Sequence, residues 1–283
     1  MIKSDYRESV LKKIKMLESE GRFNEDVEDD PVSIELLPNK VDYLNEKLSS
    51  KIACKFANIV GTRFFEKMIK NNQFIIDKIV GIDNFLSVEG GAIITSNHFN
   101  ITDNYAIWRT IKPYMNGKML YKVIKEGNYT NPPKPFGFIM KNCNTLPLSS
   151  NTETMKKFFR ALEVLLKRGE KILVYPEQSM WWNYKKPRPY KEGAFRFAVS
   201  NNVPIIPVFI SMQDSDILDN EGYYVQKLTI HFMKPIYKKE ELSKRENIEF
   251  MRKENFKVCV QKYEEVYGEK YNLIDMEKCL KVE

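Results

Sequence analysis

Short apolar runs of strand-forming residues alternate with amphipathic helical segments through the middle of the chain, and this alternation restricts its fold more than any other feature. The expected strands cover residues 74–80, 92–95, 118–123, 145–148, 171–175, 205–210 and 228–232. Helical patterns between them cover residues 103–111, 152–168 and 193–200. Strands that alternate with helices predict an α/β domain with a mixed, largely parallel sheet flanked by helices.

Helical patterns also flank this region. They are expected at residues 4–20, 41–71 and 248–267, where apolar residues recur at helical spacing. We therefore divide the chain into an N-terminal helical part (1–72), the α/β core (73–240) and a C-terminal helical segment of the same domain (241–283). An acidic loop, residues 25–30, separates the first two helices and is closed by Pro31.

The composition is that of a folded protein. Of 283 residues, 43% are hydrophobic and 12% aromatic, which provides ample material for a core. The cysteines are scattered, with no Cys-x-x-Cys pair, so we expect reduced thiols and no metal site; they are Cys54, Cys143, Cys259 and Cys279. The first 20 residues are charged throughout, so we expect no signal peptide, and no apolar stretch is long enough to span a membrane.

The second helical pattern is a candidate membrane-surface element. It carries apolar residues on one side and many Lys and Arg residues between them, and the net charge of the chain is +7. We expect its Ile52–Ile69 end to lie on an anionic membrane and its Leu44 end to pack on the core. The alternative is that the whole helix packs on the core.

The chain has only two histidines, His98 and His231. His231 lies within an expected strand, where we predict a structural role. His98 follows the strand at residues 92–95 and lies in the loop that leads to Asp103. Ligands of α/β sheets bind where such loops leave the carboxyl ends of strands.

This spacing allows the Asp103 carboxylate to accept a hydrogen bond from one His98 ring nitrogen. The other nitrogen would then take a proton from a hydroxyl group. Alone the pair is weak support, since Asp103 could merely cap a helix.

The surroundings of this pair resemble a known family. Asn97-His98 followed by Asp103 resembles the first sequence block of the glycerolipid acyltransferases, the 1-acylglycerol-3-phosphate acyltransferase family. The other three blocks follow in order: Phe136-Gly137-Phe138 with Leu146-Pro147-Leu148, then Val174-Tyr175-Pro176-Glu177, then Lys191-x-Gly193-Ala194 with residues 203–208. The resemblance covers residues 73 to 236. It implies the glycerol-3-phosphate acyltransferase-like fold for the core.

The resemblance implies an O-acyltransferase with His98 and Asp103 as catalytic residues. The enzyme would move a fatty acyl group from a thioester of coenzyme A or acyl carrier protein to a lysophospholipid, with 1-acylglycerol-3-phosphate as the expected acceptor and phosphatidic acid as product. It would need no other cofactor and no metal. The expected location is cytoplasmic, peripherally on the inner face of the cell membrane.

Two departures from the family pattern concern the acceptor. Arginines that commonly end the second and third blocks are replaced here by Ser149-Ser150 and by Gln178-Ser179-Met180. Since arginine recognises phosphate through a planar fork, phosphate recognition must come from elsewhere. We expect substrate contacts from Asn97, Glu177, Lys185, Lys186, Arg188 and Lys191, with Trp181 and Trp182 either at a lipid interface or packed on the core.

Three alternatives stay open. The first is an acyltransferase for another lipid or amine acceptor without phosphate, and the second is a lipid-binding protein that has lost catalysis. The basic, aromatic stretch at residues 181–191 is the one candidate patch for nucleic acid, which we do not expect as a partner.

Overall fold

A seven-stranded sheet organises the molecule. The computed structural model describes residues 3–133 and 135–272, and its strands are β1 (Ile75–Val80), β2 (Ala92–Thr95), β3 (Leu120–Ile124), β4 (Thr145–Pro147), β5 (Lys171–Val174), β6 (Ile205–Leu218) and β7 (Tyr224–Phe232). Their order in the sheet is β1-β7-β6-β2-β5-β3-β4. All neighbours are parallel except β6 and β7, which form an antiparallel hairpin. The predicted mixed, largely parallel sheet is thereby confirmed.

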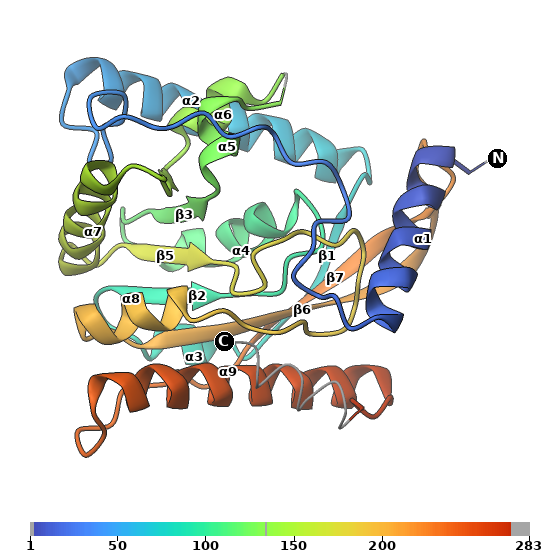
Figure 1. The fold of residues 1–283 in the computed structure, drawn as a ribbon. Helices are drawn as coiled ribbons and strands as arrows, with labels where there is room; N and C mark the ends of the chain where they lie inside the picture. The colour runs from blue at the N-terminus through green and yellow to red at the C-terminus, as the bar shows by residue number, and fades with distance from the viewer. Residues whose placement is uncertain (1–2, 134, 273–283) are drawn as a thin grey trace.

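Helices cover both faces of this sheet (Figure 1). Alternate residues of each central strand point to opposite faces, so Ile93 belongs to one buried cluster and Ile94 to the other. The first cluster is closed by α7 (Thr152–Lys167), α8 (Gly193–Asn201) and α9 (Lys244–Tyr267). The second is closed by α4 (Asp103–Ile111), α3 (Ile82–Leu86) and the last turns of α2 (Leu48–Lys70).

Most predicted elements are present within a few residues of their expected ends. Two differ. Residues 41–47 are not helical, so α2 begins only at Leu48. The strand expected at residues 205–210 continues to Leu218, because its outer part pairs with β7 beyond the core, where most of its residues are exposed.

The sequence pattern did not predict the short elements. They are α3, α5 (Glu126–Thr130), α6 (Gly137–Asn142) and the 3-10 turn η1 (Lys112–Tyr114), each too short to show a helical period. In the described residues, no helix is long and apolar enough to cross a bilayer.

The N-terminal part is tied to the edge of the sheet where the parallel strands end. Helix α1 (Asp5–Ser19) begins at a Ser4 cap and buries Val10, Ile14 and Leu17. These side chains form one cluster with Trp181 and Trp182, which follow β5. From α1 the chain then runs across this edge of the sheet to α2 (Figure 1).

Candidate active site

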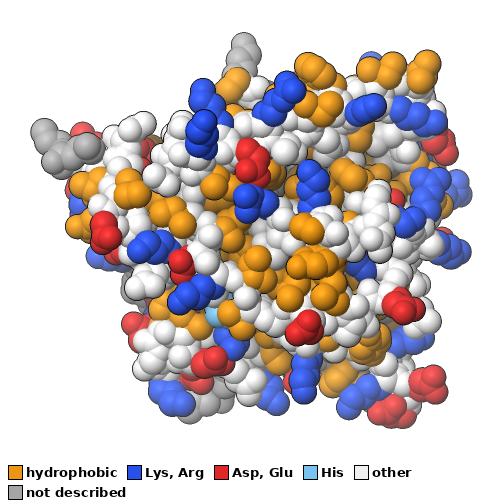
Figure 2. Space-filling model, turned by 180° about the vertical axis from the view of Figure 1, so that it is seen from behind, with side chains coloured by type: hydrophobic (Ala, Val, Ile, Leu, Met, Phe, Trp, Pro, Cys, Tyr) orange, Lys and Arg blue, Asp and Glu red, His pale blue; other side chains and the backbone are white. Residues whose placement is uncertain are grey.

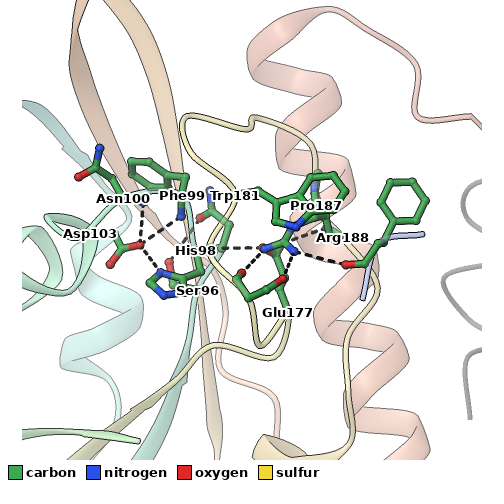
Figure 3. Close-up of polar contacts among 12 residues, drawn as sticks. Ser96, His98, Phe99, Asn100, Asp103, Glu177, Trp181, Pro187 and Arg188 are labelled. Carbon is green, nitrogen blue, oxygen red and sulfur yellow. Dashed lines mark hydrogen bonds and ion pairs between the residues drawn. The ribbon is translucent and has the colours of Figure 1, made fainter. Parts of the chain in front are cut away.

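His98 and Asp103 meet at the carboxyl end of β2. The strand ends at Thr95, the chain turns outward, and α4 begins with Asp103. The Nδ1 atom of His98 lies 2.7 Å from Oδ2 of Asp103, which confirms the predicted hydrogen bond (Figure 3). The Asp103 side chain is fully buried, and the same Oδ2 accepts the Phe99 backbone N–H at 3.2 Å. The carboxylate therefore fixes both the imidazole and the loop that carries it.

Tyr175 supports this pair from the neighbouring strand. Its hydroxyl donates to Oδ1 of Asp103 at 2.6 Å, and its ring stacks on the His98 ring with centroids 3.9 Å apart. Burial, reinforced by the Asp103 carboxylate, raises the pKa of Tyr175 well above its usual value, so the phenol remains a proton donor.

Tyr175 belongs to the third sequence block, but the sequence predicted no role for it. The signal lay in the pairing of β2 with β5, which sets Thr95 beside Val174 and makes the residues after both strands neighbours.

Glu177 and Arg188 form a buried ion pair beside residues 97–103, the candidate catalytic loop (Figure 3). Oε2 of Glu177 accepts the His98 backbone N–H at 3.3 Å and lies 2.9 Å from Nη2 of Arg188. Oε1 accepts the Arg188 backbone N–H at 2.9 Å. Arg188 also donates to the Ser179 hydroxyl and stacks on the Trp181 ring. The pair is thus part of the scaffold that holds His98.

These contacts correct three expected substrate contacts. The Arg188 side chain is 1% exposed and committed to Glu177, so it cannot receive a phosphate group. Both Glu177 oxygens are bonded within the scaffold. Asn97 is buried, and its amide bonds both the N–H and the carbonyl of Ile210 on β6. Glu177 and Arg188 are buried because they meet across the segment after β5, and Asn97 because its amide pairs with β6, which sequence spacing does not reveal.

The lysines of the same stretch are placed differently. Lys186 pairs with Glu18 of α1 at 2.7 Å, and Lys185 lies over the Tyr267 ring of α9. Lys191 is half-buried, and its backbone N–H donates to the Pro176 carbonyl. Trp181 and Trp182 are buried against α1, so the packed alternative holds and the lipid-interface alternative is wrong for them.

A cavity of about 490 Å³ lies beside the catalytic loop. Asn100, Ile101 and Thr102 line one wall, and the outer β6–β7 hairpin with residues 71–74 lines the others. Arg7 is the basic residue in its lining, and it is paired with Glu28 at 2.5 Å and Glu221 at 2.9 Å. Within the described residues, the side-chain oxygens of Asn183 and Gln226 have no hydrogen-bond partner.

His231 has the structural place predicted for it. It lies on β7, and its Nε2 is 2.9 Å from the Ser211 hydroxyl on β6. Across residues 3–133 and 135–272, no group of three His, Cys, Asp or Glu side chains is arranged to hold a metal ion. Cys279 lies outside the described residues.

Comparisons with known proteins agree with this geometry. The acyltransferase family model matches residues 78–211, which contain the His98–Asp103 pair and the Glu177–Arg188 pair. The fold is similar to the crystal structure of the 1-acyl-sn-glycerophosphate (LPA) acyltransferase PlsC from Thermotoga maritima. The TM-score is 0.51 at 19% identity, covering 81% of this chain and 87% of that one. The comparison with curated proteins finds no match.

The family match and the fold lead to the same conclusion. Residues 78–211 form a domain of the acyltransferase family, in a chain whose fold is similar to that of the 1-acyl-sn-glycerophosphate acyltransferase PlsC.

Proposed function

We propose that the protein transfers a fatty acyl group from a thioester donor to a hydroxyl of a single-chain glycerolipid, with His98 as the general base. One observation carries this proposal: His98 is held through Nδ1 by a buried carboxylate, while its Nε2 has no hydrogen-bond partner among the described residues. The side chain is 22% exposed, so an acceptor hydroxyl can approach it.

The transfer then needs no acyl-enzyme. The Nε2 atom takes the proton of the acceptor hydroxyl while the oxygen attacks the thioester carbonyl. Asp103 stabilises the imidazolium that forms, and Tyr175 keeps the Asp103 carboxylate in place. When the carbon–sulfur bond breaks, the proton passes from His98 to the thiolate, which leaves as the free thiol. The donor is an acyl-coenzyme A or an acyl carrier protein thioester, and the transfer uses no further cofactor.

Thiol release tests this proposal. The full-length protein is incubated with an acyl-coenzyme A, or with acyl carrier protein, and a lysolipid acceptor. We expect His98→Ala to lose about a thousandfold or more in kcat. His231→Gln is the matched control, because it changes the other histidine and should retain activity. A folded wild type that binds lysolipid but releases no thiol with either donor would instead indicate a non-catalytic lipid-binding protein.

We further propose that the enzyme works peripherally at the cytoplasmic face of the cell membrane. Helix α2 exposes Leu48, Ile52, Phe56 and Ile59, with Lys51 and Lys55 between them and Lys47 directly before Leu48. Figure 2 shows hydrophobic and basic side chains interspersed along the upper edge of the molecule, where α2 lies. Such a surface suits the interface of an anionic bilayer.

A basic cavity adjoins this exposed surface of α2. It has a volume of about 790 Å³ and is lined by Lys51, Lys55, Arg63, Lys112 and Lys118. None of the five forms an ion pair within the part of the chain that the structure describes. The cavity supports the preference for anionic lipid.

A further inference from the structure

An acidic segment of the N-terminal part docks on the catalytic edge of the sheet. We call residues 25–37 the acidic strap. The strap packs on α5, where the Pro31 carbonyl lies so close to Gly127 that no Cβ would fit. Its backbone N–H groups at Ile34 and Leu36 donate to Thr130 and Glu126, at 3.1 and 2.8 Å. These contacts fix the carboxylates of the strap in place.

Two of those carboxylates bind Lys125. This lysine directly follows β3, which pairs with β5 in parallel. It therefore leaves the sheet at the same carboxyl edge as Tyr175 and Glu177, which follow β5. Its Nζ lies 2.9 and 3.0 Å from the two oxygens of Asp26 and also contacts Asp30.

Carboxylates also cover the other side of the catalytic loop. Arg7, in the lining of the 490 Å³ cavity, is held by Glu28 of the strap and by Glu221. Below the loop, Arg188 is held by Glu177 and Lys186 by Glu18. Lys185 and Lys191 form no ion pair with the residues described, and Lys185 lies on the Tyr267 ring.

A phosphate monoester carries a charge of about −1.5 to −2 near neutral pH. Because binding removes part of its hydration shell, it needs unpaired cations to stabilise that charge. At Lys125 it would compete with Asp26 and Asp30, and at Arg7 with Glu28 and Glu221. A hydroxyl group has no such requirement. The lining of the cavity beside the loop instead includes Asn183 and Gln226, whose buried carboxamide oxygens have no partner among the described residues and are acceptors for a hydroxyl donor.

We propose that the acceptor is a single-chain lipid with an uncharged, hydroxyl-bearing head group, and that the acidic strap excludes phosphate monoesters by neutralising Lys125. This inference rests on the acyl transfer proposed at His98. Specificity for the acceptor then comes from two sources: the strap carboxylates disfavour a phosphate group, and the carboxamides of Asn183 and Gln226 favour a hydroxyl group.

The test compares two acceptors with the same acyl chain, 1-monoacylglycerol and lysophosphatidic acid, at a fixed thioester donor. We expect a higher kcat/KM with monoacylglycerol. In the double variant Asp26→Asn with Asp30→Asn, Lys125 is released, so kcat/KM for lysophosphatidic acid should rise roughly fivefold, mainly through KM. The value for monoacylglycerol should not change.

Two further variants locate the effect. Asp29→Asn removes one negative charge from the strap at a residue that does not contact Lys125, and it should leave the preference unchanged. Adding Lys125→Met to the double variant should abolish the gain. Melting temperatures of all variants show whether each is folded.

Wild-type preference for lysophosphatidic acid would overturn the inference while leaving acyl transfer intact. If Lys185→Met or Lys191→Met then removed that preference, the phosphate site would belong to the stretch at residues 181–191. Thiol release with neither acceptor, from a folded wild type, would overturn the inference and acyl transfer to these lipids together.

Discussion

At the scale of the residue, the support that Tyr175 gives to Asp103 can be measured by removing its hydroxyl. Its hydroxyl is the donor to Oδ1 of Asp103, and that carboxylate is fully buried. Tyr175→Phe should therefore lower kcat roughly tenfold, because a hydrogen bond to a buried charge is lost while the stacked ring remains. Tyr105→Phe is the control, since its hydroxyl bonds Glu66 of α2 instead. An unchanged kcat and pH profile in Tyr175→Phe would show that Asp103 needs no second support.

His231 gives a prediction about stability and pH. Burial, with the nearby Lys262 cation, lowers its pKa from 6.5 to about 4. The unfolded chain therefore binds a proton more readily than the folded one between those values, and the free energy of unfolding falls as pH decreases from about 6.5 to about 4.

Acid titration of the melting temperature measures this effect. We expect His231→Gln to lose less stability than the wild type across that window, by up to about 3 kcal/mol. Parallel curves for the two proteins would show that other groups dominate acid unfolding.

At the scale of the element, the turn after β5 depends on the Glu177–Arg188 pair. Arg188→Ala leaves the Glu177 carboxylate buried without its cation, and we expect a loss of about 3–5 kcal/mol in the free energy of unfolding. Chemical denaturation measures it, with Lys185→Ala as a control from the same stretch. A variant with wild-type stability would mean that the turn relaxes to let water reach Glu177.

The elements themselves were largely predictable, because their periodicities are local properties of the chain. Strand β2 and helix α4 were predicted with their observed bounds, and this placed His98 and Asp103 at the carboxyl end of the sheet. The burial of Arg188 could not be predicted from local periodicity. A basic residue in a polar stretch indicates a surface, whereas its burial depends on Glu177 and Trp181 meeting it across a turn.

At the scale of the whole molecule, the N-terminal part is not a separable anchor. Helix α1 is buried against Trp181 and Trp182, and the strap binds Lys125. The spacing of apolar residues predicts an amphipathic helix, but it does not predict the surface on which that helix packs. The predicted division is confirmed at Leu44, which packs on the core, and at Ile52, Phe56 and Ile59, which are exposed. It is wrong at the end of α2, where Phe65, Met68 and Ile69 pack on the core.

Membrane binding must therefore be tested without deleting the N-terminal part, since its removal would uncover the catalytic scaffold. The change is Ile52→Glu with Phe56→Glu, at side chains that are 61% and 58% exposed. Burial of these two side chains in a bilayer is worth about 1.5–3 kcal/mol each, so the variant should bind anionic vesicles at least tenfold more weakly. Flotation with vesicles of phosphatidylglycerol and phosphatidylcholine measures this. Tyr237→Glu, 54% exposed outside α2, should bind like the wild type. Equal binding by all three folded proteins would exclude this face of α2 as the contact. Weaker binding by Tyr237→Glu alone would move the contact to the region between β7 and α9.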